Sequence, residues 1–342
     1  MFVRNCWYVA AWSEEVRSGL LARTILGEPV VMYRTSDGAV HALQDRCAHR
    51  CMPLSKGAVV DDHVVCCYHG LTYAPSGACV RIPGAASVPP SLKVPSYPVH
   101  ERYGAVWIWM GDPTRADPET IFACAGVDVR GGGHHYYFPV KANYLLVNDN
   151  LSDLLHQAYL HNPSFGGNAT PLGEFRPKVH QREQEMDVAW EWKGIEAPAL
   201  FGEVGSIAGI SDGWNRSHFR APSFYINRVG FARAGTGGID SPLPQGDGKL
   251  SLVINQLITP ETEKTTHFFK IVHCSWPERL VPQLDRFIVN VNKEDIWACE
   301  AQQQMIDGSP EAVMHAIPTD VPVVQMHRIV DRLIAAEKAG RS

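Results

Sequence analysis

Short runs of alternating apolar and polar residues, punctuated by glycine, proline and aspartate, dominate the first third of the chain. Runs of about four to eight residues bounded by such turn formers are typical of β-strands. Proline and glycine are dense over 75–98, which favours loops, and proline, aspartate and threonine near 113–120 favour a domain boundary. The expected strands of this β-rich part are 30–34, 39–43, 58–60, 63–65 and 105–110.

Longer elements are expected in the rest of the chain. Residues 141–161 carry a helical pattern that Asn162-Pro163 would end, because proline lacks the amide hydrogen that a helix needs. Two further helices are expected at 280–305 and 321–338, and the glycine-rich segment 230–248 is expected to be a loop. The expected strands are 187–193, 223–231, 250–258 and 265–274.

Strands in succession, with helices segregated between them, indicate an α+β fold with an antiparallel sheet. We expect an all-β domain at 1–115 and a second domain, with the sheet and the helices, at 116–342. A chain of 342 residues has room for two such domains, since one domain takes about 150 residues.

Composition narrows the function classes. A hydrophobic content of 45% and a charged content of 20% describe an ordinary globular protein with a large core. The net charge of −5, without a Lys/Arg-rich run, argues against nucleic acid as a partner. We expect no membrane span, because no apolar run reaches about 18 residues. Nine cysteines without an export signal indicate reduced thiols and a cytoplasmic location.

Two short arms carry the most specific chemistry. Each offers one cysteine and one histidine: Cys47-x-His49 and Cys66-x₂-His69. A Rieske-type [2Fe–2S] cluster needs this set, with two cysteines on one iron and two histidines on the other. Neutral imidazoles raise the potential of such a cluster to about −150 to +300 mV, against about −400 mV for an all-cysteine plant-type cluster. We therefore expect an electron-transfer site.

A structural zinc site is the alternative, because Cys₂His₂ is also a zinc ligand set. Zinc fingers place like ligands together on each arm, whereas here each arm mixes the two types, so the cluster is favoured. Two other cysteines, Cys51 and Cys67, lie beside the ligands. Unpaired buried thiols are favoured for them over a disulfide between the two.

A second group of metal-binding residue types lies in the expected helix 141–161. Asp149, Asp153 and His156 fall within about 60° of one another on a regular helix, so they share a face. His161 would lie about 140° away from His156. One metal can take both histidines only if the helix unwinds or bulges, which Pro163 favours.

Two histidines need one carboxylate to complete a facial triad for Fe(II), which leaves three coordination positions open. Asp295 in the expected helix 280–305 is our choice, and Glu294 and Asp285 compete with it.

Together the two motifs resemble the oxygenase components of Rieske non-heme iron monooxygenases, in the branch of vanillate O-demethylase, dicamba demethylase and toluenesulfonate methyl-monooxygenase. The resemblance covers nearly the whole chain. Supporting stretches are Asn5 to Ala10, Trp107 to Pro113, Val147 to His161 and Thr259 to Thr262.

The resemblance implies a Rieske domain joined to a helix-grip-like catalytic domain, and it assigns roles to residues. Cys47, His49, Cys66 and His69 would hold one [2Fe–2S] cluster. The ligands of one mononuclear Fe(II) would be His156, His161 and Asp295. Asp153 matches a carboxylate that is not a ligand and that bridges His69 of one subunit and His156 of the next in a homotrimer.

The resemblance also implies an activity. With O₂ as co-substrate, such an enzyme hydroxylates a methyl or O-methyl group of an aromatic acid, and the methoxy product loses formaldehyde. Electrons would come from NADH through a separate reductase with a flavin and a ferredoxin-type cluster, since this chain lacks a G-x-G-x-x-G fingerprint after a strand. The alternatives are a ring-hydroxylating dioxygenase and a Rieske electron carrier without enzymatic activity.

An anionic aromatic substrate needs cationic or N–H donors. Candidates for these contacts are Asn215, Asn227, Arg228, Gln256 and Arg286. Further residues considered for the pocket are Trp214, Arg216, His218, Phe224 and Tyr225.

Overall fold

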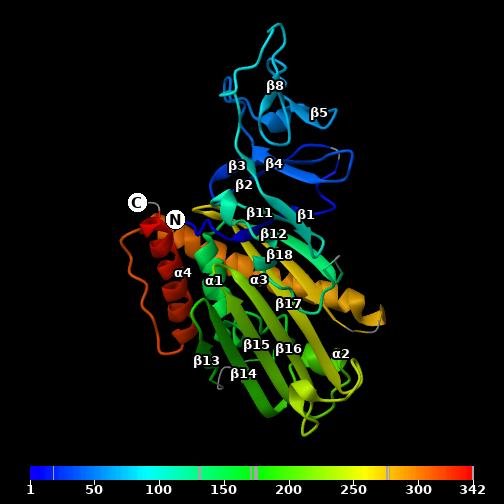
Figure 1. The fold of residues 1–342 in the computed structure, drawn as a ribbon. Helices are drawn as coiled ribbons and strands as arrows, with labels where there is room; N and C mark the ends of the chain where they lie inside the picture. The colour runs from blue at the N-terminus through cyan, green and yellow to red at the C-terminus, as the bar shows by residue number, and fades with distance from the viewer. Residues whose placement is uncertain are drawn as a thin grey trace. The chain divides into compact units, whose positions relative to one another are not determined.

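The structure is a computed structural model that describes residues 1–17, 19–129, 132–169, 172, 176–274, 276 and 278–340. The N-terminal strands form three small sheets (Figure 1). Contacts between residues divide the chain into two units. Unit 1 comprises Met1–Ala123, Asp128–Gly132 and Thr259–Glu263, and unit 2 comprises Cys124–Val127, Gly133–Ile258 and Lys264–Ser342.

Unit 1 is built from short antiparallel strands, as their alternating pattern predicts. One sheet has the order β1 (Trp7–Trp12), β11 (Ala105–Trp109), β10 (Val99–Arg102). A second has the order β2 (Leu21–Ile25), β3 (Glu28–Arg34), β4 (Val40–Gln44), β9 (Ser96–Tyr97). The third has the order β5 (Ala58–Val60), β6 (His63–Val65), β7 (Thr72–Tyr73), β8 (Cys79–Arg81).

Unit 2 is organised around one large sheet, and this confirms the α+β prediction. Its strand order is β12 (His134–Val140), β18 (Thr265–His273), β17 (Lys249–Thr262), β16 (Phe224–Arg233), β15 (Ile210–Arg220), β14 (Glu185–Glu196), β13 (Lys178–Gln181). The helices are α1 (Tyr144–Ser152), α2 (Ala199–Val204), α3 (Val281–Gly308) and α4 (Val321–Ala339), and α1 packs against both α3 and α4.

Single turns of 3₁₀ helix complete the described elements. They are η1 (Leu54–Lys56), η2 (Pro113–Arg115), η3 (Pro118–Thr120), η4 (Leu155–Ala158), η6 (Gly238–Asp240) and η7 (Glu278–Leu280). Within the described part of the chain, no helix is long and apolar enough to cross a bilayer.

The expected helix 141–161 is wrong in its extent. Asn143 caps the start of α1, because its side-chain oxygen accepts a hydrogen bond from the Leu145 amide at 2.9 Å. The helix ends at Ser152, where Asp153 takes an extended conformation and its carboxylate accepts from the Leu155 amide at 2.9 Å. The separate turn η4 follows, and residues 159–166 form further turns, so the chain has left the α-helix before His156 and is still not α-helical near Pro163.

The other long elements follow the pattern more closely. Strands β14, β16, β17 and β18 and helices α3 and α4 lie at the expected segments, with ends shifted by a few residues. The expected loop 230–248 is shorter, because β16 runs on to Arg233. Strands β12, β13 and β15 of this sheet were not predicted from the pattern of the sequence, although β15 alternates buried and less buried side chains over much of its length.

Candidate metal sites and substrate cavity

Two loops of unit 1 repeat the same backbone turn. The amide of Cys47 donates to the carbonyl of Met52, and the amide of Cys66 donates to that of Leu71, each at 2.8 Å. In each loop the residue four places after the cysteine donates back to the cysteine carbonyl at 3.0 Å. Local hydrogen bonds thus shape both arms, which explains how a short motif specifies the site.

The residue at that returning position has a positive φ in both loops. In the second loop it is Gly70, with φ 69°, and a Cβ there would lie 2.9 Å from the ring of Pro83. In the first loop it is Cys51, with φ 56°. A side chain in this region is strained, so the turn is maintained against a local cost at Cys51.

The four predicted cluster ligands divide into a buried and an exposed pair. Cys47 and Cys66 are each 2% exposed and belong to the core of unit 1, whereas His49 and His69 are exposed, with ring centroids 4.7 Å apart. Burial raises the pKa of the Cys66 thiol. Buried sulfur donors and solvent-facing imidazoles suit a cluster that receives and passes electrons at its histidine side.

A tyrosine supports the buried pair. The Tyr73 hydroxyl lies 3.2 Å from Sγ of Cys47 and accepts a hydrogen bond from the Ala48 amide at 3.1 Å. As a thiolate ligand the sulfur can only accept a hydrogen bond, so the Tyr73 hydroxyl would donate to it when a cluster is bound.

Cys51 and Cys67 are free thiols, as favoured, but both are exposed and the expectation of burial is wrong. The loops turn their flanking positions toward solvent.

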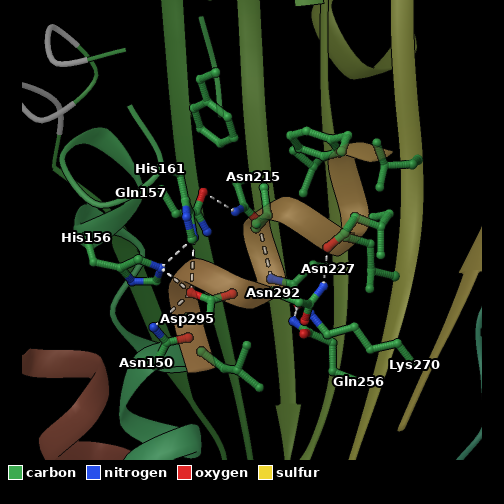
Figure 2. A pocket seen from close by; sticks show the side chains of 18 residues that line it. Asn150, His156, Gln157, His161, Asn215, Asn227, Gln256, Lys270, Asn292 and Asp295 are labelled. Atoms are coloured by element: carbon green, nitrogen blue, oxygen red, sulfur yellow. Dashed lines mark hydrogen bonds and ion pairs between the residues drawn. The ribbon is translucent and has the colours of Figure 1, made fainter. Parts of the chain in front are cut away.

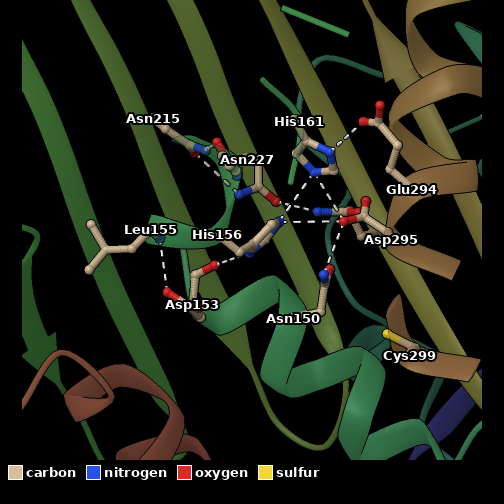
Figure 3. A network of polar contacts seen from close by, with 12 residues as sticks. Asn150, Asp153, Leu155, His156, His161, Asn215, Asn227, Glu294, Asp295 and Cys299 are labelled. Atoms are coloured by element: carbon tan, nitrogen blue, oxygen red, sulfur yellow. Dashed lines mark hydrogen bonds and ion pairs between the residues drawn. The ribbon is translucent and has the colours of Figure 1, made fainter. Parts of the chain in front are cut away.

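In unit 2 the chain brings His156, His161 and Asp295 together (Figure 3). Oδ1 of Asp295 lies 3.1 Å from Nε2 of His161 and 3.4 Å from Nε2 of His156. The two Nε2 atoms are 3.2 Å apart. Three donors that converge in this way match a facial triad, and two imidazoles with one carboxylate fit an Fe(II) ion.

Each histidine is oriented through its other nitrogen. Nδ1 of His156 contacts the backbone carbonyl of Asp153, and Nδ1 of His161 lies 2.8 Å from Oε2 of Glu294. Glu294 also accepts from the Ser164 hydroxyl at 2.8 Å. Such contacts set the tautomer, so that Nε2 is the nitrogen available to a metal.

Burial and charge act against each other in this cluster. Burial would raise the pKa of the Asp295 carboxyl, but the two neighbouring imidazoles outweigh it and lower that pKa. For His161, burial lowers the pKa, but the Asp295 and Glu294 carboxylates raise it by more, so the net shift is upward. The Asp295 carboxylate is therefore ionised, as a metal ligand must be.

The competing carboxylates have other partners. Asp285 accepts a hydrogen bond from the Tyr136 hydroxyl, and Glu294 contacts the far nitrogen of His161. Asp149 points to α4, where its Oδ1 lies 2.6 Å from Nε2 of His327. Asp153 contacts His156 through its backbone carbonyl, and its carboxylate caps Leu155.

The triad opens into a cavity of unit 2 (Figure 2), which encloses about 600 Å³ of empty space, part of it open to solvent. Helix α3 forms one wall and strands β15 to β18 form the other. Eight of the 18 lining side chains are apolar: Leu151, Phe165, Val229, Leu252, Ile254, Phe287, Ile288 and Val291. Apolar walls with a few polar groups are typical of sites that bind small organic molecules.

Some predicted contact residues line this cavity and others do not. Asn215, Asn227 and Gln256 do. Arg228 is exposed, since neighbouring residues of a strand face opposite sides of the sheet, and Arg286 is exposed on α3. None of Trp214, Arg216, His218, Phe224 and Tyr225 lines it either.

Sequence reasoning missed four polar residues of the cavity, one of which is Gln157, whose side-chain oxygen accepts from Asn215 at 3.1 Å. Asn150 donates to Oδ1 of Asp295 at 3.0 Å, and Asn292 lies one helical turn before Asp295. Lys270 is the fourth, and it is 4% exposed. A single lysine inside the apolar strand 268–272 was the available signal, because lysine is almost never fully buried without a partner.

Two parts of the chain match models of known protein families. Residues 6–98 match the model of the Rieske [2Fe-2S] domain, and residues 140–336 match that of the vanillate O-demethylase oxygenase C-terminal domain. The protein is therefore an oxygenase component of the Rieske type. Within that class, it belongs to the family defined by the vanillate O-demethylase oxygenase C-terminal domain.

Individual relatives are similar over the whole chain. The iron-sulfur subunit of the toluene-4-sulfonate monooxygenase system of Comamonas testosteroni is 35% identical, with 99% of each chain covered. The vanillate O-demethylase oxygenase subunit of a Pseudomonas species is 32% identical, with 99% of this chain and 96% of the relative covered. A crystal structure of dicamba monooxygenase bound to 3,6-dichlorosalicylic acid superposes with a TM-score of 0.86 at 32% identity, covering 99% of each chain.

Proposed function

We propose that this oxygenase component hydroxylates a methyl or O-methyl group of an aromatic carboxylate or sulfonate. The convergence of His156, His161 and Asp295 in a cavity that also has apolar walls carries the proposal. An iron ion held by these three residues would supply O₂ activation. The substrate class follows the relatives, which act on toluene-4-sulfonate and vanillate by name.

The chain's own residues would prepare the reaction. Glu294 and the Asp153 carbonyl hold the two rings with Nε2 toward the cavity, and Asn150 orients the Asp295 carboxylate. The apolar walls exclude water and hold the ring of the substrate. With O₂, two electrons and two protons, a methoxy group becomes a hemiacetal and one water forms, and the hemiacetal then splits into a phenol and formaldehyde.

Cys47, His49, Cys66 and His69 are proposed to hold the cluster that supplies the electrons, on loops within a domain at 1–115. The domain at 116–342 would hold the iron. Exposed rings at His49 and His69 support electron transfer at that face. A separate NADH-dependent reductase with a flavin and a ferredoxin-type cluster would reduce the cluster, and a homotrimer would pass electrons between subunits. The odd number of cysteines, nine in a large chain, supports a cytoplasmic location.

Metal analysis, EPR and product identification test this function. The purified protein should hold about three irons per chain, and dithionite should produce the rhombic signal of a Rieske cluster. With a surrogate reductase, 4-methylbenzenesulfonate should give its benzylic alcohol and 4-methoxybenzoate should give formaldehyde. A cis-diol product would indicate a ring dioxygenase, and two irons without turnover would indicate an electron carrier. Either result would contradict the proposal.

A further inference from the structure

Lys270 is a buried cation in the substrate cavity. It lies on β18, is 4% exposed, and its Nζ lies 4.5 Å from the ring centroid of Phe268, two residues earlier on the same face. Among the described residues, no hydrogen bond or ion pair involves this Nζ, and Asp295 affects it only at longer range. A buried ammonium group normally has a paired anion.

The nearby sheet surface offers no such anion. It presents a chain of neutral amides, in which Nε2 of Gln256 donates to Asn227 at 2.6 Å. Nδ2 of Asn227 donates to Asn215 at 3.3 Å, and Nδ2 of Asn215 donates to Gln157 at 3.1 Å. These amides carry no charge, and the remaining side chains of the sheet wall are apolar.

The only carboxylate that lines the cavity, within the described part of the chain, is Asp295, and it already contacts His156, His161 and Asn150. Burial lowers the pKa of Lys270 to about 8, and the negative charge of Asp295 opposes that shift. At pH 7 the Lys270 side chain is therefore protonated in most molecules. A positive charge with no bound partner thus faces the cavity.

We propose that Lys270 binds the anionic group of the substrate. The inference rests on the proposed function and adds the residue that selects an aryl carboxylate or sulfonate over a neutral ring. Figure 2 shows Lys270 and Gln256 on one side of the cavity and His156, His161 and Asp295 on the other. A single ring with its anion at Lys270 would point its opposite substituent, the methyl or methoxy group, toward the triad.

Calorimetric titration of the anaerobic holoprotein at pH 7 tests this assignment. The probes form two matched pairs: 4-methylbenzenesulfonate with 4-methylbenzenesulfonamide, and 4-methoxybenzoate with 4-methoxybenzamide. The variants are Lys270→Met, which keeps the length of the side chain without its charge, and Lys178→Met. Lys178 is exposed on β13 and does not line the cavity, so the second variant controls for net charge.

Wild-type protein and the Lys178→Met variant should bind each anion at least tenfold more tightly than its amide. Lys270→Met should remove this preference while amide binding changes less than threefold. Equal affinity for anion and amide in the wild type, or a preference that survives in Lys270→Met, would overturn the assignment. Turnover distinguishes the failure of this assignment from the failure of the proposed function. If anions bind through Lys270 but neither anionic probe is oxidised, only the proposed function is contradicted.

Melting temperature checks that Lys270 is not a structural residue. A buried, unpaired charge destabilises the fold, so Lys270→Met should melt no lower than the wild type. A clear fall in melting temperature together with unchanged anion preference would assign a structural role and contradict the proposal. If Lys270→Met does not fold, Lys270→Gln, which is neutral and polar, takes its place in the same titrations.

Discussion

Oε2 of Glu294 lies 2.8 Å from Nδ1 of His161, and this contact directs the other nitrogen of the ring toward His156 and Asp295. The two adjacent carboxylates of α3 therefore have different tasks. Asp295 faces the cavity as the third donor of the triad, and Glu294 orients the His161 ring through its Nδ1 atom. Adjacent helix positions point about 100° apart, which allows one helix to approach both sides of the same ring.

Glu294→Gln should weaken the binding of mononuclear iron by about 10- to 100-fold, the usual effect of losing such a supporting carboxylate. The cluster signal should not change. Iron titration of protein stripped of its mononuclear iron measures the effect. Glu300→Gln, on the same helix, is the control, because Glu300 accepts from the Lys141 amide at 2.9 Å and does not line the cavity. Equal iron affinity in both variants would show that Glu294 has no orienting role.

Asp153→Asn should keep both metals and lose about 10- to 100-fold in turnover, if the carboxylate links the cluster of one subunit to the iron of the next. The fold should survive, since asparagine caps a turn as well as aspartate does, and the Leu155 amide keeps its acceptor. Stopped-flow oxidation of the pre-reduced cluster in the presence of substrate measures the transfer step. A normal rate would rule out the bridging role.

Mixed oligomers should recover activity that neither parent has. Cys66→Ser should lack the cluster, and His161→Ala should lack the mononuclear iron. If electrons pass only between neighbouring subunits, random exchange should restore about a quarter of the wild-type rate, because half of the donors and half of the acceptors are intact. The assay is product formation after dissociation and reassembly of a 1:1 mixture. Mixtures that stay inactive would indicate transfer within one chain.

Tyr73→Phe should lower the reduction potential of the cluster. The Tyr73 hydroxyl lies 3.2 Å from Cys47 Sγ, and a hydrogen bond to sulfur stabilises the reduced, more negative state. A net value of about 1 kcal/mol for one hydrogen bond corresponds to about 40 mV for one electron. Protein-film voltammetry gives the value. Tyr97→Phe is the control, since its hydroxyl donates to Glu28 at 2.6 Å; an equal shift in both variants would contradict the assignment.

Lys270→Met should change the pH dependence of stability. Burial lowers the pKa of Lys270 to about 8 from 10.5, so between these values the unfolded chain binds more protons than the folded one. Wild-type stability should therefore rise with pH across this window, relative to the variant. Full protonation of the buried amine costs about 3 kcal/mol, so the advantage of the variant should be greatest below pH 8 and fade toward pH 10. Urea unfolding at several pH values, compared with Lys178→Met, measures it.

Local patterns determined much of this protein. Cys47-x-His49 and Cys66-x₂-His69 were found in the sequence, because the turn that shapes each arm involves hydrogen bonds within about five residues. The alternating strands and the long helices α3 and α4 were also found, since burial on one face imposes a period that a sequence displays.

Tertiary structure decided the rest. Between His156 and His161 the chain forms the 3₁₀ turn η4 and further turns instead of an α-helix, and Nε2 of His156 lies 3.2 Å from that of His161, which a regular helix would hold apart. Asp295 lies more than 130 residues after His161 along the chain. Its other partner, Asn150, is 145 residues away from it in the sequence. Lys270 became a cavity residue only through strand register and the covering helix α3. Contacts between distant segments depend on how whole elements pack, and no local period records that packing.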